Sequence, residues 1–149
     1  FLALVLMTVT TLLPFLISEQ AWRSSFTLFI IHRFFLVYAI CILFDYRDRQ
    51  DDIAAGIRSL ITYLNEKGIY ALFIFSLVVF AASTIGLYWF GYNIVLIVIL
   101  LLPGLITAFL YQKAMHDFSD IFYYFVLDGL MAFSSVLTLI PVNWLNLRT

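Results

Sequence analysis

The sequence predicts an all-α fold, a polytopic transmembrane helical bundle of about five helices in a single membrane domain over residues 1–149. Hydrophobic residues make up 64% of the chain and the mean hydropathy is +1.06, whereas a soluble domain is about 45–50% apolar. Charged residues make up only 11%. So much apolar surface does not fit inside one soluble core of this size, so we expect lipid to be the solvent.

The apolar residues form five continuous runs, at residues 1–17, 26–44, 69–90, 94–111 and 121–140. Continuous runs indicate helices, and only helices or closed barrels satisfy backbone polar groups in lipid. The last four runs approach the ~20 residues that a helix needs to cross a bilayer, and the first is shorter. The chain opens at Phe1 without the basic start of a signal peptide, so we expect it to begin inside or just before a membrane helix, as a fragment.

Four polar connections separate the runs, at residues 18–25, 45–68, 91–93 and 112–120. The third is short enough to be a tight turn. Basic residues favour one side of the bundle: Arg47, Arg49, Arg58, Lys67 and Lys113 lie there, against Arg23 and Arg148 on the other. The positive-inside rule therefore puts the 45–68 connection in the cytoplasm of a multi-pass protein, which we expect in a cell inner membrane. The opposite side carries Trp22, Trp89 and Trp144, as an interfacial aromatic belt would.

Composition also argues against some classes of protein. The net charge of -1 provides no basic surface for nucleic acid. Cys41 is the only cysteine, which supports neither a disulfide framework nor a cysteine metal site. The glycines form no dinucleotide or phosphate-loop motif.

The most informative stretch is the acidic start of the 45–68 connection. On a helix that continues the second apolar run by two or three turns, Asp45, Asp48 and Asp52 share one face, while Asp51 points away. Gly56 is expected near the same face, where it would leave room for a bulky headgroup. Three carboxylates at this spacing repel one another unless a cation compensates them.

This arrangement suits a magnesium-diphosphate headgroup. Mg²⁺ prefers oxygen ligands and is usually held by one or two carboxylates plus substrate phosphates. Phosphate oxygens match the guanidinium groups that are nearby, those of Arg47, Arg49 and Arg58. The competing interpretation is a solvated charged loop at the membrane surface.

The stretch resembles the second Asp-rich motif of the UbiA superfamily of membrane prenyltransferases. The matching residues are Asp48-x-x-x-Asp52, then Gly56, Arg58 and Ser59, with Asp45 as the additional upstream acid that some members carry. The specific match covers about residues 44–68. This family has nine membrane helices, with its second motif between the sixth and seventh. Two apolar runs precede the motif here and three follow it, so the chain corresponds to the second half of that fold.

The resemblance implies an integral membrane prenyltransferase. It would move an isoprenoid group from its diphosphate to an aromatic or other lipophilic acceptor within membrane lipid. Asp48 and Asp52 are the implied catalytic residues, Asp45, Asp48 and Asp52 the implied Mg²⁺ ligands, and Arg47, Arg49 and Arg58 the implied diphosphate contacts. In the family a first, Asn-Asp-x-x-x-Asp type motif shares the metal. This chain lacks that motif, so the fragment alone is expected to be inactive.

Two alternatives remain open. One is a non-catalytic UbiA-like membrane protein. The other is a transporter or scaffold with an acidic cytoplasmic cation site, although transporters usually place ionisable residues near the bilayer midplane. An intact or substituted first motif upstream would separate the catalytic from the non-catalytic form.

Further polar and aromatic residues are candidates for the site or its surroundings. Asp128 lies inside the fifth run, where a carboxylate is either functional or a packing residue, and we expect it to pair with Arg33 of the second run. The 112–120 connection is either a lid over the headgroup or a solvated loop; its polar residues are Lys113, His116, Asp117 and Asp120. Aromatic rings that would stabilise a passing cation are Phe34, Phe35, Tyr38, Tyr70 and Phe73.

Overall fold

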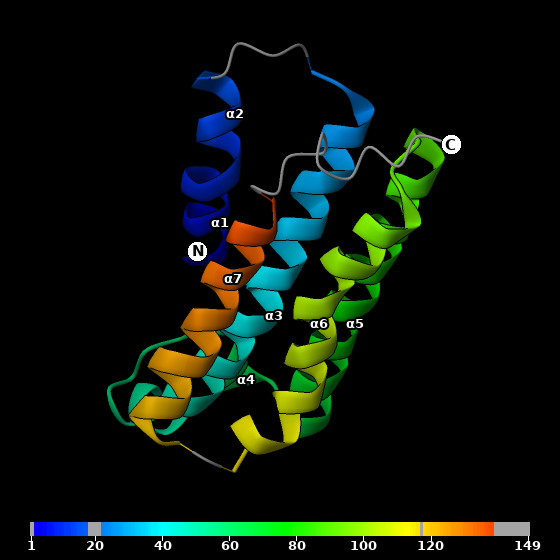
Figure 1. The fold of residues 1–149 in the computed structure, drawn as a ribbon. Helices are drawn as coiled ribbons and strands as arrows, with labels where there is room; N and C mark the ends of the chain where they lie inside the picture. The colour runs from blue at the N-terminus through cyan, green and yellow to red at the C-terminus, as the bar shows by residue number, and fades with distance from the viewer. Residues whose placement is uncertain (1, 18–21, 117, 139–149) are drawn as a thin grey trace.

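The structure is a computed structural model that describes residues 2–17, 22–116 and 118–138. All regular elements in these ranges are helical, which confirms the predicted all-α class (Figure 1). In chain order they are α1 (Leu2–Met7), the π-helical turn η1 (Thr8–Leu12), α2 (Leu13–Ile17), α3 (Ser24–Ala54), α4 (Leu60–Tyr63), α5 (Glu66–Gly86), the 3₁₀ turn η2 (Leu87–Phe90), α6 (Ile94–Ala114), the π-helical turn η3 (Phe122–Leu127) and α7 (Asp128–Thr138).

Three helical segments of the described chain are long and apolar enough to cross a membrane: Ser24–Ala54, Glu66–Phe90 and Ile94–Ala114. They correspond to the second, third and fourth predicted runs. The first and fifth runs form shorter apolar helices, Ala3–Leu12 and Phe122–Leu137. Position 1 and positions 139–140, which those runs also included, lie outside the described residues.

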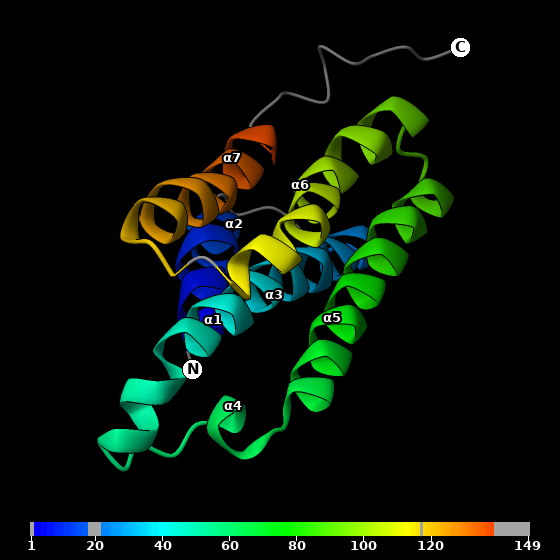
Figure 2. The ribbon, with the colours of Figure 1, turned by 90° about the horizontal axis from the view of Figure 1, so that it is seen from below.

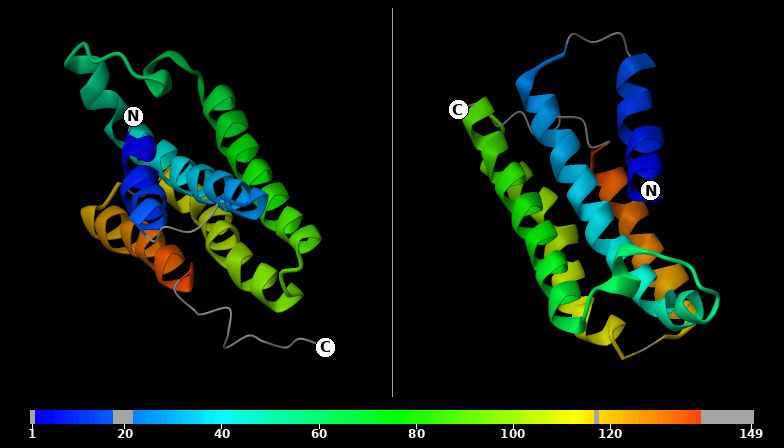
Figure 3. Two further views of the ribbon diagram at one scale, coloured as in Figure 1. Left: turned by 90° about the horizontal axis from the view of Figure 1, so that it is seen from above. Right: turned by 180° about the vertical axis from the view of Figure 1, so that it is seen from behind.

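Helix α3 runs through the middle of the bundle. Helices α5 and α6 lie on one side of it, and α1, α2 and α7 lie on the other (Figure 2 and Figure 3). Its buried Leu36, Ile40 and Leu43 pack in one cluster with Phe73 and Phe80 of α5. Apolar contacts on both sides hold α3 in place, and this fixes the position of the acidic residues at its end.

Two consecutive polar residues of α3 join it to opposite neighbours. His32 is buried, and its Nδ1 lies 2.6 Å from Oγ1 of Thr84 on α5. Arg33 is also buried, and its guanidinium donates to the hydroxyls of Ser134 and Ser135 on α7. The predicted pairing of Arg33 with Asp128 is therefore wrong, because Arg33 lies level with the serines of α7, and Asp128 is six residues, about 9 Å along the helix axis, from Ser134.

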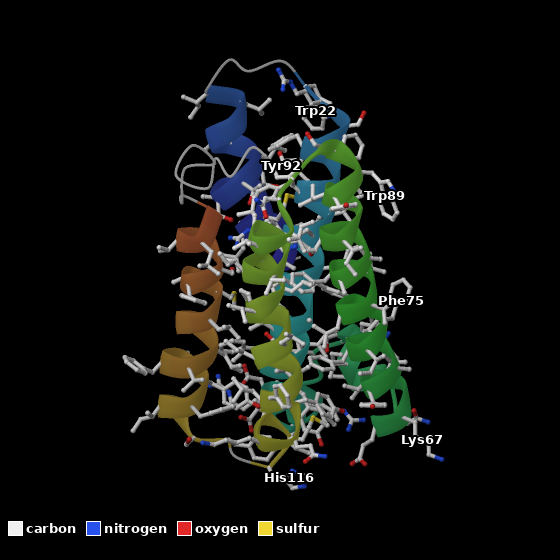
Figure 4. All side chains as sticks on the ribbon, turned by 45° about the vertical axis from the view of Figure 1, so that its right-hand side comes forward. Trp22, Lys67, Phe75, Trp89, Tyr92 and His116 are labelled. Atoms are coloured by element: carbon white, nitrogen blue, oxygen red, sulfur yellow. The ribbon has the colours of Figure 1, made fainter. Side chains whose placement is uncertain are left out.

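The two ends of the bundle differ in chemistry. Trp22, Trp89 and Tyr92 lie at one end, and Lys67 and His116 lie at the other (Figure 4). Trp22 and Trp89 are both exposed, as the predicted belt requires. Two residues used in the same prediction, Trp144 and Arg148, lie outside the described ranges.

The predicted tight turn at residues 91–93 is present. Gly91 ends η2 with φ of 82°, a left-handed conformation that favours glycine. Asn93 then caps α6, its side chain accepting a hydrogen bond from the Val95 N–H. The turn makes α5 and α6 antiparallel neighbours.

Candidate functional site

The acidic stretch continues the helix that precedes it, as predicted. Helix α3 passes from the apolar run without a break and ends at Ala54, so residues 45–54 add between two and three turns. Asp45, Asp48 and Asp52 are consequently on one face, and Asp45 and Asp52 are about 10 Å apart along the axis at 1.5 Å per residue. The carboxylates form a stripe rather than a single cluster.

The acidic face continues the side of α3 that packs against α1 and α7. One turn before Asp45, Cys41 is buried in a cluster with Ala3 of α1, and Met131 of α7 packs against it. Asp45 follows Cys41 by four residues on α3, so the two side chains lie on the same face of the helix. The stripe is therefore presented toward the α1 and α7 side of the bundle and away from α5.

Negative charge on this face is only partly compensated. Asp48 pairs with Arg47, the Nε to Oδ1 distance being 2.7 Å. Asp45 is exposed and Asp52 half-buried, and neither carboxylate has a hydrogen bond or ion pair with any residue that the structure describes. Two of the three carboxylates thus keep all their oxygens available.

These donors fit a hard cation. Carboxylate oxygens are what Mg²⁺ prefers, and one or two of them suffice when phosphates and water complete its coordination. Over residues 2–17, 22–116 and 118–138, no three side chains of His, Cys, Asp or Glu form a group that could hold a metal by themselves. By itself the stripe is therefore not a complete ligand set for a metal ion.

The three arginines have different environments. Arg49 donates from Nη2 to the Leu64 carbonyl at 2.9 Å, and its Nε is buried without a hydrogen-bond partner among the described residues. Arg58 is exposed and contacts no described residue through a hydrogen bond or ion pair. Arg47 is enclosed, with 13% of its side chain exposed. Among the three, Arg58 is the one whose guanidinium is open to a phosphate.

Gly56 does not lie on the acidic helical face, and that prediction is wrong. The helix has already ended: the Ile57 N–H donates to the Asp52 carbonyl at 2.8 Å and the Gly56 N–H to the Ile53 carbonyl at 3.2 Å. These two bonds form a Schellman motif with glycine in the left-handed position, at φ of 72°. A Cβ at Gly56 would meet nothing within 4 Å, so backbone conformation and not space explains this glycine.

The chain then returns toward α3 through the short helix α4. Ser59 caps α4 in a reciprocal capping box with Thr62. Leu64, directly after α4, is the residue whose carbonyl accepts from Arg49. Arg49 thus ties this connection to the end of α3, and Figure 3 shows the connection running back beside that helix.

The five aromatic candidates divide between two sides of α3. Phe34 and Tyr38 stack with ring centroids 5.7 Å apart and pack against the cluster of Cys41, on the acidic side. The other three belong to the α5 side: Phe35 contacts Phe75, whereas Tyr70 and Phe73 both contact Tyr111. The structure thus brings two of the five to the side that carries the carboxylates.

The 112–120 connection approaches the Asp-rich stretch through one residue. Asp120 Oδ1 lies 3.7 Å from Arg47 Nη1. Lys113 Nζ lies 5.0 Å from the Phe122 ring centroid, and His116 Nδ1 lies 2.8 Å from the Gln112 carbonyl. Asp117 is outside the described residues.

Sequence reasoning did not single out the aromatic surroundings of Arg47. Its Cζ lies 4.9 Å from the ring centroids of both Tyr123 and Tyr124, and 5.7 Å from that of Phe44. The adjacent tyrosines at 123 and 124 are visible in the sequence, but their approach to Arg47 is a contact between distant segments, α3 and the π-helical turn η3. Asp128, at the junction of η3 and α7, is exposed and has no ion pair with a described residue.

Comparison of the chain with protein-family models, with curated proteins and with solved structures finds no match.

Proposed function

We propose that this chain is part of an integral membrane prenyltransferase of the UbiA type, which transfers an isoprenoid group from its diphosphate to a lipophilic acceptor. The observation that carries the proposal is the acidic stripe of Asp45, Asp48 and Asp52. It extends a membrane-spanning helix beyond its apolar run, and two of its carboxylates have no partner among the described residues. A water-exposed stripe that continues an apolar surface suits a substrate with a charged head and a lipid tail.

Each residue of the stripe has a separate part in this proposal. Asp48 and Asp52, one turn apart, hold Mg²⁺ jointly with the diphosphate, and Asp45 extends the ligand set. Mg²⁺ held there would act as a Lewis acid toward the diphosphate. Arg58 donates hydrogen bonds to phosphate oxygens, since its guanidinium is exposed.

The membrane part of the site is proposed on the same side of α3. The stacked rings of Phe34 and Tyr38 lie on the face that leads to Asp45. They exclude water and give the isoprenoid chain an apolar and aromatic wall. We propose that the Asp-rich end faces the cytoplasm of a cell inner membrane, because Arg47, Arg58 and other basic residues gather at that end. Opposing carboxylates, from a first Asp-rich motif, complete the ligand set.

The test uses the full-length protein in lipid nanodiscs and farnesyl diphosphate as the probe. Farnesyl diphosphate with Mg²⁺ is expected to raise the thermal unfolding midpoint of the wild type, because a ligand that binds the folded state stabilises it. Asp48→Asn and Asp52→Asn are expected to lose this shift. Asp51→Asn is the matched control, since Asp51 lies on the same two turns but off the stripe.

Three results would reject the proposal. They are no Mg²⁺-dependent shift in the wild type, a full shift in both stripe variants, or equal loss in the Asp51→Asn control. Release of inorganic diphosphate, followed in the same samples, then distinguishes a transferase from a protein that only binds the diphosphate.

A further inference from the structure

Arg47, which follows Asp45 by two residues on α3, is surrounded by three aromatic rings. Its Cζ is 4.9 Å from the ring centroids of Tyr123 and Tyr124, and 5.7 Å from that of Phe44. Only 13% of the side chain is exposed. Cations over aromatic faces are attracted by the ring quadrupole, and more strongly when they are partly desolvated.

From within this enclosure Arg47 also bonds to Asp48. Neighbouring residues of a helix do not face each other, so an adjacent pair seldom makes a close ion pair unaided. Here the Arg47 Nε to Asp48 Oδ1 distance is 2.7 Å. At the same time Nη2 of Arg47 donates to the Tyr124 hydroxyl at 3.2 Å. The Tyr124 hydroxyl thus binds the terminal Nη2 of the guanidinium, while Nε binds the Asp48 carboxylate.

The π-helical turn η3 supplies the two rings. Tyr123 is buried, and its hydroxyl donates to the Ala114 carbonyl at 2.7 Å, which fixes it to the end of α6. Tyr124 follows directly and is exposed, yet it reaches the same guanidinium. π-helical turns inside helices are frequent at functional sites.

We propose that Arg47 is a positioning residue for Asp48 and not a phosphate ligand. Tyr124 and Tyr123 hold the guanidinium so that its Nε donates to Oδ1 of Asp48, and Oδ2 is the oxygen that would be left for a divalent cation. The inference rests on the proposed function. It adds that η3, through Tyr123 and Tyr124, raises the affinity of the site for the metal. Groups that orient a metal ligand from behind typically change metal affinity or activity by about 10–100-fold when mutated.

The experiment titrates Mn²⁺, as a paramagnetic substitute for Mg²⁺, into the full-length protein in nanodiscs and measures binding by electron paramagnetic resonance. Arg47→Lys keeps the charge but loses the fork that joins Asp48 to Tyr124. Tyr124→Leu removes ring and hydroxyl, and Tyr124→Phe only the hydroxyl. Phe125→Leu is the matched control, since Phe125 is the next residue of η3 and is 79% exposed.

Arg47→Lys and Tyr124→Leu are expected to weaken Mn²⁺ binding about tenfold, Tyr124→Phe less, and Phe125→Leu not at all. A structural role alone would lower the thermal midpoint and leave Mn²⁺ affinity unchanged, and that result overturns the inference. Tyr124→Phe, which changes one hydroxyl on an exposed ring, remains informative if Arg47→Lys does not fold.

The two proposals fail in different ways. If Asp48→Asn abolishes Mn²⁺ binding while Arg47→Lys and both Tyr124 variants bind as the wild type does, only the positioning role is rejected. If the wild type binds no Mn²⁺, the metal site and the positioning role are rejected together.

Discussion

Gly104 of α6 lies directly against the ring of Phe80 of α5. A Cβ at position 104 would collide with that ring, since it would lie 2.7 Å from Cδ1 and 2.8 Å from Cζ. The same ring stacks on His32 of α3 with centroids 4.7 Å apart. One aromatic side chain thus sets the separation of three helices, and the absence of a side chain at Gly104 allows it.

Gly104→Ala is expected to destabilise the protein by about 1–3 kcal/mol, the usual cost of overpacking a well-filled interior. Thermal or denaturant unfolding in nanodiscs measures the change, and Phe80→Leu in the same chain is expected to restore part of the loss. Gly129→Ala is the control, because nothing lies within 4 Å of a Cβ there. Equal destabilisation by both alanine variants would contradict the packing argument.

Local periodicity allowed part of the structure to be predicted. The helical register of Asp45, Asp48 and Asp52 follows from spacing alone, and the structure has it. Gly56 was misplaced, since the helix ends two residues earlier in a motif formed by backbone bonds. Whether glycine at such a position continues a face or ends a helix is decided by φ, which spacing does not encode.

Contacts between distant segments were beyond prediction for a different reason. Arg33 meets Ser134 instead of Asp128 because the position of α7 along its axis and its rotation about that axis select the residue. Similarly, Arg47 meets Tyr123 and Tyr124, which lie in the π-helical turn η3. Rotation and local winding depend on the packing of the entire bundle, whereas residue spacing is a local property.

The buried guanidinium of Arg33 makes the stability of the protein depend on the hydroxyls of Ser134 and Ser135. Ser134→Ala combined with Ser135→Ala removes both acceptors and leaves a buried charge, so we expect a loss of about 3–5 kcal/mol in unfolding free energy. Adding Arg33→Met removes the charge and is expected to recover most of that loss. The prediction fails if the unfolding free energy of the triple variant is no higher than that of the double variant.

The bond between His32 and Thr84 has a defined direction. The Thr84 hydroxyl donates its single proton to the Phe80 carbonyl at 2.7 Å, so it accepts from Nδ1 of His32. Thr84→Val leaves a buried Nδ1–H without an acceptor, at an expected cost of about 1–3 kcal/mol. Thr84→Ser preserves the hydroxyl and is expected to cost less. Unfolding midpoints of the two variants measure the difference, and similar values would show that the hydroxyl does not matter.

Gly56 controls the path of the chain from α3 into α4. Its φ of 72° costs a residue with a Cβ about 1–2 kcal/mol, although the site has space. Gly56→Ala is therefore expected to loosen the 55–59 connection, which tryptic cleavage after the exposed Arg58 measures as a faster rate. Gly56→Asn is the matched comparison, because asparagine adopts left-handed φ more readily than alanine. If alanine and asparagine leave the cleavage rate equally unchanged, the left-handed turn is not what holds this connection in place.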